Sequence, residues 1–403
     1  MAPADLAWIM TCSALVLLMT PGLGLFYGGM VSRKNAITTI MHSFVAMGLC
    51  SVVWVLWGYS IAFGTSIGGF IGGMDYLALS GLENTDDMLF MIFQCMFAII
   101  TPALITGAFA ERMKFSAYAV FVVAWVTIVY APVAHWVWAS GGWLFEMGAL
   151  DFAGGTVVHI NSGIGALAAA LIIGPRMGFK HAAGVQHDSS EHNIPMILMG
   201  AGFLWFGWFG FNAGSALAAN EFAVNAFVVT NTAAAMGMVT WLGMALVMGK
   251  KPGAVGAASG AIAGLVAITP ACGFVGVIPA LFIGLGAGVI CYLSIELLLK
   301  LGVDDALAVW GVHGMGGTWG ALATGLFAGV GFAAAGLPGV FSPEYWDQIT
   351  VQVIGIVVTW IWSFVMTSVI LLAIKYTIGL RVTEQEEQEG LDSNQHGESA
   401  YNR

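Results

Sequence analysis

The sequence predicts an all-helical, polytopic membrane protein with eleven transmembrane helices, for three reasons. Of its 403 residues, 59% are hydrophobic and only 8% are charged, whereas soluble chains carry about 25% charged residues. Long apolar runs recur along the whole chain, and the mean hydropathy is +0.88. The 55 glycines suit helices in a bilayer, where small residues let backbones approach closely.

The charge balance excludes nucleic-acid binding. The chain has 12 Lys and Arg against 22 Asp and Glu, a net charge of -10, and so few cations form no basic stripe. The sequence also presents no nucleophile, metal or cofactor motif. We therefore predict no enzymatic activity, no metal and no cofactor.

Apolar runs mark the individual spans, because a helix needs about 20 apolar residues to cross the hydrocarbon. The stretch 253–271 is short and rich in Gly and Ala, so hydropathy alone leaves it ambiguous. The ten clear runs cover residues 6–31, 37–63, 88–110, 116–138, 152–174, 194–214, 222–248, 273–299, 306–330 and 350–378.

The basic residues decide the ambiguous stretch, since Lys and Arg collect in cytoplasmic loops. If 253–271 spans the membrane, all twelve basic residues fall on one side; if it does not, the alternation breaks after Lys251. We therefore predict eleven helices in the cell (inner) membrane, with the N-terminus outside and the C-terminus in the cytoplasm. The residues concerned are Arg33, Lys34, Arg112, Lys114, Arg176, Lys180, Lys250, Lys251, Lys300, Lys375, Arg381 and Arg403.

An odd number of helices suggests two inverted halves of five helices and one extra helix, an arrangement common in transporters. Val158-His159 followed by Gly163 in the fifth span matches Val312-His313 followed by Gly317 in the tenth. We predict a transporter domain over 1–379, with one repeat over about 6–174, a second over about 194–330 and the extra helix over about 350–378. Residues 380–403 form a polar, acidic tail, either solvated or a docking and regulatory element.

His159 and His313 are the unusual residues of the membrane region, because an imidazole in hydrocarbon is costly and faces the bundle interior or a pathway. Desolvation favours neutral rings, able to bond each other or to pass a proton. A structural role is the usual alternative for a single histidine, and a metal site would need further ligands at suitable spacing. Matching positions in the two halves favour a pore.

Further candidates lie toward the outer half of the membrane. Asp151 precedes the fifth span and is expected to cap that helix, or else to meet an entering cation. Six aromatic and hydroxyl side chains are placed to cradle a small cation through cation–π attraction and a hydroxyl acceptor, although packing is the alternative for each of them. They are Phe93, Phe97, Trp138, Trp208, Phe211 and Ser215.

Several motifs, in order along nearly the whole chain, resemble the ammonium transporter (Amt/MEP/Rh) family, specifically its bacterial and archaeal Amt branch. They are PGLGLFYGGMV, ITGAFAERMKFSAY, LDFAGGTVVHINSG, FGWFGFNAGSALAANE, SGAIAGLVAITPACGF, VDDALAVWGVHGMGG and the tail segments GLRV, EGLD and HGESAY. Two positions depart from the family pattern, in which an acidic residue often stands at Ala308 and Phe at Trp310.

The resemblance implies a homotrimer in which each subunit encloses its own narrow pore. It also implies that a PII-type (GlnK-like) regulator docks on the cytoplasmic face and that the tail couples the subunits. The implied recruitment site is Trp138, Phe93 and Ser215, the gate is Phe97 and Phe211, and Asp151 is a structural acid at the pore mouth. The implied pore residues are His159 and His313, with Trp208 as a wall.

The predicted function is ammonium uptake, with methylammonium as an analogue. Passage of the bare cation is disfavoured, because it loses its hydration at a cost of several kcal/mol and the predicted lining offers no carboxylate. We expect deprotonation near the gate, passage of ammonia and net, electrogenic proton transfer. The alternatives are an electroneutral gas channel of the Rh type and an ammonium sensor, which is expected to carry a signalling domain longer than this tail.

Overall fold

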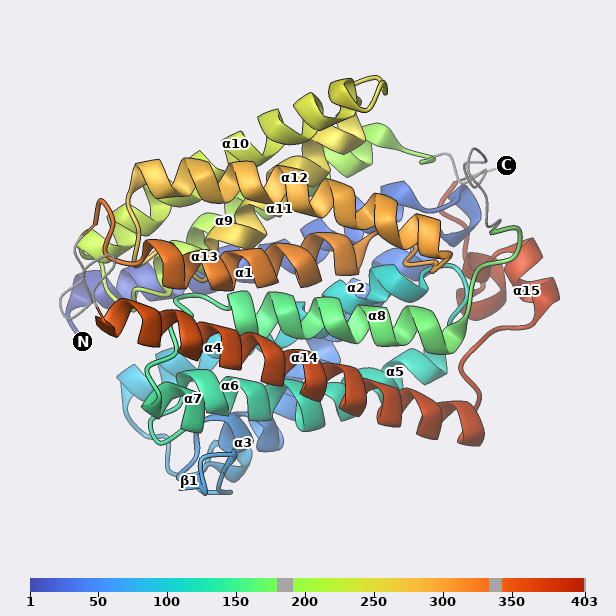
Figure 1. Cartoon of the computed structure of the whole chain (residues 1–403). Coiled ribbons are helices and arrows are strands. Elements are labelled where there is room, and N and C mark those ends of the chain that lie inside the picture. Colours follow the sequence, from blue (N-terminus) through green and yellow to red (C-terminus); the bar gives the residue numbers. More distant parts are fainter. Residues whose placement is uncertain (180–190, 333–342, 402–403) are drawn as a thin grey trace.

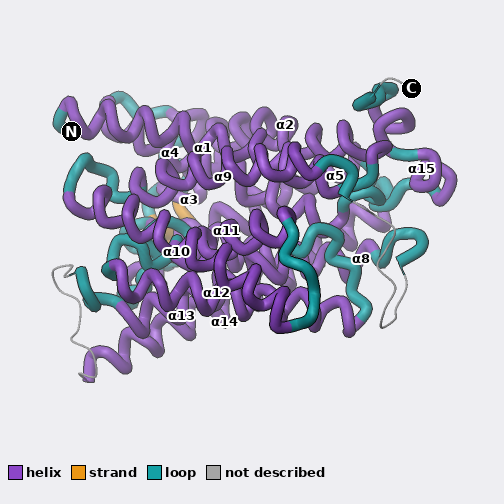
Figure 2. The backbone as a smooth tube through the Cα atoms, turned by 90° about the horizontal axis from the view of Figure 1, so that it is seen from above, coloured by secondary structure: helices purple, strands orange, loops and turns teal. Residues whose placement is uncertain are grey.

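Helices connect two opposite faces of the protein in the computed structural model, which describes residues 1–179, 191–332 and 343–401 (Figure 1). The N-terminus lies at one end of the helix bundle and the C-terminus at the other, and a view turned by 90° shows the same arrangement (Figure 2). We call these ends the N-terminal face, which carries Met1, and the tail face, which carries α15 (Glu384–Glu389).

The first half of the chain forms five membrane-crossing segments, several of which contain π-helical or 3₁₀ turns. They are α1 (Pro3–Met30); α2 (Ala36–Val53) with η2 (Trp54–Gly58) and α3 (Tyr59–Phe63); α4 (Thr85–Ile105) with η4 (Thr106–Phe109); α5 (Phe115–Trp125) with η5 (Val126–Tyr130) and α6 (Ala131–Trp138); and η6 (Gly155–Ile160) with α8 (Asn161–Ile173). The smaller elements are η1 (Arg33–Asn35), the strands β1 (Ser66–Ile67) and β2 (Ile71–Gly72), η3 (Leu77–Leu79) and α7 (Trp143–Glu146).

The second half repeats the pattern and adds one helix. Its segments are α9 (Ile194–Gly214), α10 (Glu221–Val247), α11 (Ala254–Ile268), α12 (Val277–Leu301), η7 (Trp310–Gly314) with α13 (Met315–Phe327), and finally α14 (Pro343–Thr377). Beyond α14 lie α15 and η8 (Asp392–His396).

The predicted count of eleven spans is confirmed. Nine helices within the described ranges are long and apolar enough to cross a membrane, and α11 and the joined η7–α13 segment bring the total to eleven. At 15 residues, α11 is about 22 Å long, shorter than a full crossing, which is why hydropathy left it ambiguous. The predicted start of the last helix was seven residues late, because its first turns carry Glu344 and Asp347; acidic residues lower hydropathy but stabilise a helix N-terminus.

The basic residues all lie on the tail face in the described part of the chain, as the span count requires. Each lies close to a helix end on that face. The positions are between α1 and α2, between η4 and α5, after α8, between α10 and α11, at the end of α12, and at or after the end of α14. Lys180 and Arg403 lie outside the described residues. The described set is Arg33, Lys34, Arg112, Lys114, Arg176, Lys250, Lys251, Lys300, Lys375 and Arg381.

Close helix contacts explain part of the high glycine content. The first helices of the two halves, α1 and α9, pack along each other. A Cβ atom at Gly200 of α9 would lie 2.3 Å from the backbone nitrogen of Phe26 in α1. Only glycine allows the two backbones to approach this closely, as expected for helices that associate through small residues in a bilayer.

A buried ionic cluster joins three loops on the tail face. The Arg176 guanidinium lies 2.8 Å from the carboxylate of Glu111 and 2.8 Å from that of Asp304. Arg112 donates to the backbone carbonyl of Asp304 at 2.7 Å. Arg176 follows α8, Glu111 and Arg112 follow η4, and Asp304 follows α12. The cluster therefore connects the first half of the protein to the loop that leads into η7.

The pKa of Glu111 shows how the cluster responds to pH. Burial acts to raise this pKa, but the Arg176 charge and hydrogen bonds from Ser32 and Asn35 outweigh burial and lower it from 4.5 to about 2. Because the folded-state pKa is depressed, the contribution of this carboxylate to stability is complete above about pH 4.5 and is lost as the pH falls toward 2. The cluster is therefore fully charged at neutral pH.

The C-terminal tail is docked on the protein's own tail face, so it is not a freely solvated segment. Glu387 lies 2.8 Å from Arg381 and accepts a hydrogen bond from the backbone of Met177 at 2.7 Å. Asp392 accepts hydrogen bonds from the backbone of Ile37 and Thr38 at the start of α2. These contacts place the tail against the start of α2 and the segment that follows α8.

Candidate functional site

Asp151 caps the segment that carries His159. Its carboxylate accepts four backbone hydrogen bonds, from Gly154 at 2.9 Å, Gly155 at 2.6 Å, Thr156 at 2.8 Å and Val157 at 3.1 Å. These are the donors that a helix start leaves without partners. Asp151 is 6% exposed and provides acceptors for the free N–H groups at the start of η6. This arrangement agrees with the capping interpretation.

Asp305 stands at the corresponding position in the second half, where it accepts fewer backbone hydrogen bonds than Asp151, and it was not among the site residues predicted from the sequence. It accepts a hydrogen bond from the backbone of Trp310 at 2.7 Å, in the first turn of η7. The detectable signal was spacing: Asp305 precedes His313 by eight residues, as Asp151 precedes His159. The shared pattern is thus an Asp, a His eight residues later that follows a Val, and a Gly four residues after the His. It extends the internal repeat toward the start of each segment.

The two histidines meet in the interior of the bundle. Their Nδ1 atoms lie 3.3 Å apart, and the ring planes are inclined by 29° with centroids 5.3 Å apart. His159 is 1% exposed and His313 is 4% exposed. In a hydrogen bond between two neutral rings, one Nδ1 carries the proton and the other accepts it, so the second ring must be the Nε2–H tautomer. The pair is therefore coupled, and a proton at one ring sets the state of the other.

Two glycines allow this pairing by letting each histidine segment touch the other. A Cβ at Gly163 would lie 2.0 Å from the backbone nitrogen of Gly314, directly after His313. A Cβ at Gly317 would lie 2.9 Å from the backbone nitrogen of Ile160, directly after His159. The contacts are reciprocal, as expected for inverted halves, and they explain why a Gly stands four residues after each His.

We expect the substitution Gly163→Ala to abolish transport and to lower the free energy of unfolding by about 3 kcal/mol or more, because the new methyl group overlaps backbone atoms that cannot move aside. Thermal unfolding of the detergent-solubilised protein measures the stability change. The matched control is Gly202→Ala in α9, where a Cβ meets nothing within 4 Å. Equal unfolding temperatures for the two variants would contradict the close contact.

Aromatic rings continue from the histidines toward the N-terminal face. Phe97 and Phe211 lie with ring centroids 4.3 Å apart and planes inclined by 36°. Phe211 stacks on His159 at 5.9 Å, and Trp208 stacks on the same ring at 5.4 Å with an inclination of 26°. The two phenyl rings and the histidine pair thus follow one another without an intervening polar group.

Two of the predicted recruitment residues contact Phe97 on the side toward the N-terminal face. Phe93 lies 5.0 Å from the Phe97 ring and Trp138 lies 5.8 Å from it, both edge to face. Trp138 donates its indole N–H to the Asp151 carbonyl at 2.9 Å. Ser215 ends α9 and donates to the Phe211 carbonyl at 2.8 Å, which leaves its oxygen lone pairs as acceptors. The structure thus brings all six predicted aromatic and hydroxyl residues to one region of the bundle.

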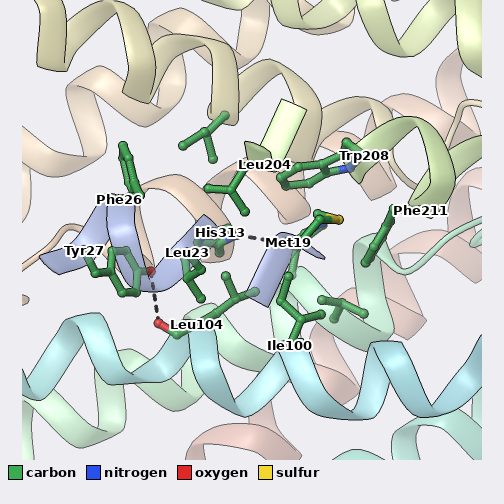
Figure 3. Close-up of a pocket in the computed structure, with 13 residues that line it drawn as sticks. Met19, Leu23, Phe26, Tyr27, Ile100, Leu104, Leu204, Trp208, Phe211 and His313 are labelled. Carbon is green, nitrogen blue, oxygen red and sulfur yellow. Dashed lines mark hydrogen bonds between the residues drawn. The ribbon is translucent and has the colours of Figure 1, made fainter. Parts of the chain in front are cut away.

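Two adjoining narrow cavities lie in the interior of the bundle, and Figure 3 shows the first of them. His313 lines both of them, and among the described residues no carboxylate lines either. Ala308 lines the second cavity toward the tail face, so an alanine and not an acid stands at this position of its lining. The first cavity is lined by Met19, Leu23, Phe26, Tyr27, Ile100, Leu104, Val158, His159, Leu204, Trp208, Phe211, Ile262 and His313.

Comparison with known proteins decides the identity of the chain. The sequence model of the Ammonium Transporter Family matches residues 7–401. The chain belongs to the ammonium transporter family. It is accordingly a multi-pass membrane protein that transports ammonium, and not an enzyme.

Individual relatives agree with this assignment. Ammonium transporter Amt1 of Archaeoglobus fulgidus is 48% identical over the full length of both chains, and the Bacillus subtilis ammonium transporter is 47% identical over 100% of this chain and 99% of its own. Among solved structures, Saccharomyces cerevisiae Mep2 is 37% identical with a TM-score of 0.89, covering 96% of this chain and 88% of its own. A sensor Amt protein is 33% identical with a TM-score of 0.92, covering 98% of both chains.

Proposed function

We propose that this ammonium transporter captures the ammonium cation outside Phe97 and Phe211, removes one proton, and passes neutral ammonia along the paired histidines. Phe93 and Trp138 supply aromatic faces for cation–π attraction. The Ser215 oxygen supplies a hydrogen-bond acceptor for the ammonium N–H groups. Phe97 and Phe211 then separate this site from the interior as a gate of two rings.

The linked histidine pair in an apolar cavity carries the proposal. A cation moving into that cavity loses its hydration at a cost of several kcal/mol, and the described lining residues of the first cavity include no carboxylate to offset the loss. Ammonia carries no charge and can exchange hydrogen bonds with the nitrogens of His159 and His313. The same argument rejects potassium, which has no proton to give up.

The coupled rings also offer a route for the proton that ammonium releases. One ring can accept a proton while the other donates its own, because their Nδ1 atoms share a hydrogen bond. Net transfer of ammonia and a proton makes transport electrogenic. In the alternative, an electroneutral gas channel of the Rh type, the proton returns to the side from which it came.

Currents on a solid-supported membrane distinguish these two mechanisms. Purified protein in liposomes is exposed to a rapid rise in ammonium concentration, with potassium as the comparison ion. Electrogenic transport predicts a current for ammonium and none for potassium. If no current appears and the liposome interior instead becomes alkaline, the protein conducts ammonia alone and the electrogenic mechanism is wrong.

The assembly and orientation form a separate part of the proposal, and they rest on family membership and on the distribution of charge. We infer that the N-terminal face lies outside the cell membrane and the tail face in the cytoplasm, because the described basic residues lie on the tail face. The chain forms a homotrimer, and a PII-type regulator of the GlnK kind docks on the tail face. The docked tail lies where such a partner would contact it.

A further inference from the structure

The third membrane segment of each half contains the same four residues, Ile-Thr-Pro-Ala, at 100–103 within α4 and at 268–271 at the end of α11. The two threonine hydroxyls behave alike within their own helices. Thr101 donates to the carbonyl of Phe97 at 2.6 Å, and Thr269 donates to the carbonyl of Leu265 at 2.7 Å. Such hydrogen bonds four residues back are common for buried threonines.

Thr269 makes one further contact for which the structure records no counterpart at Thr101. Its oxygen accepts a hydrogen bond from the indole N–H of Trp208 at 2.9 Å. Both side chains are buried, with Thr269 at 0% and Trp208 at 2% exposure. Trp208 in turn stacks on His159. The hydroxyl is thus the polar anchor of the ring that forms one wall beside the histidine.

The same corner of the chain also supports the segment that bears His159. The Pro270 carbonyl accepts a hydrogen bond from the backbone of Phe152 at 3.1 Å. A Cβ at Gly155, the first residue of η6, would lie 2.4 Å from the Pro270 ring. Thr269 and Pro270 therefore contact both sides of the passage: the tryptophan wall on one side and the start of the histidine segment on the other.

We propose that Thr269 is a positioning residue that holds the Trp208 ring stacked on His159 and thereby determines the rate at which ammonia passes the histidine pair. A buried indole N–H without a partner is unfavourable, so without the hydroxyl the indole turns toward another acceptor and leaves the stacked position. The outer capture site does not touch Thr269, so capture of the cation is unaffected. The proposal rests on the passage of ammonia beside His159 described above.

Three variants test it: Thr269→Val, which removes the hydroxyl at nearly constant volume; Thr269→Ser, which retains it; and Thr101→Val, the matched control in the other half. Uptake of labelled methylammonium into liposomes gives the maximal rate and the half-saturating concentration. We expect Thr269→Val to lower the maximal rate about tenfold with little change in the half-saturating concentration. Thr269→Ser and Thr101→Val are expected to retain the parent rate.

A maximal rate for Thr269→Val equal to that of Thr101→Val overturns the proposal. Trp208→Phe tests the proposal at the donor of the hydrogen bond, because phenylalanine keeps an aromatic ring but has no N–H group. This variant also provides the test if Thr269→Val does not fold. Its maximal rate should fall similarly, and adding Thr269→Val to it should cause no further loss. Full activity of Trp208→Phe, or additive losses in the double variant, contradicts a role exerted through Trp208.

These outcomes are separable from a failure of the proposed function. Uptake of labelled methylammonium requires no current, so the Thr269 comparison stands even if transport proves electroneutral. If replacing the histidines leaves rate and selectivity unchanged, the proposed passage beside them is wrong, whatever the Thr269 variants do.

Discussion

Replacing His159 and His313 together by alanine is expected to abolish the ammonium-specific current or to remove its selectivity over potassium. The double change removes both rings that offer hydrogen bonds to ammonia. It also removes the hydrogen bond between the two Nδ1 atoms, through which a proton can pass from one ring to the other. It also enlarges the cavity. Currents on a solid-supported membrane, recorded for ammonium and potassium jumps side by side, measure both effects.

His192→Ala is the control for this experiment. His192 contacts the Val31 carbonyl and the Tyr401 hydroxyl on the tail face, far along the bundle from the paired rings, so this variant should keep the parent selectivity. A double variant that retains both current and selectivity would rule out a role for the histidine pair. Single variants should not add up to the double, because each leaves the remaining Nδ1 without its partner.

Replacing Asp151 by alanine is expected to have the largest effect on stability. Four backbone N–H groups lose their acceptor at once in a buried site, and each buried donor left without a partner costs about 1–3 kcal/mol. We expect a loss of about 3 kcal/mol or more in the free energy of unfolding, seen as a lower thermal unfolding temperature and a poorer yield of folded protein. The unfolding temperature of Asp151→Asn should lie between those of the parent and of Asp151→Ala, because the amide retains one oxygen as an acceptor.

Asp86→Ala is the matched control, since Asp86 also stands in the first turn of a helix but its side chain is 48% exposed and forms an ion pair with the N-terminal amine. Exposed ion pairs contribute about 0–1 kcal/mol. If Asp151→Ala unfolds at the parent temperature and loses only its apparent affinity for ammonium, Asp151 contacts the cation directly and the capping role is wrong.

Local sequence patterns were sufficient to predict the class of the protein and the number of its membrane crossings. Apolar runs and basic residues report the contact of each segment with lipid or water, which is a local property, so the eleven spans and the single face of the described cations followed from residues such as Lys251 and Lys300. The matched Val-His positions also indicated the two halves. Family motifs then identified His159, His313 and the aromatic candidates.

How these residues contact one another depends on the packing of the helices. The 3.3 Å separation between the histidine nitrogens depends on close approach at Gly163 and Gly317, which no local pattern reports. The hydrogen bond between Trp208 and Thr269 and the docking of the tail through Asp392 likewise join residues that are distant in sequence. Such contacts arise from packing between segments, and hydropathy, which averages over neighbours along the chain, carries no information about them.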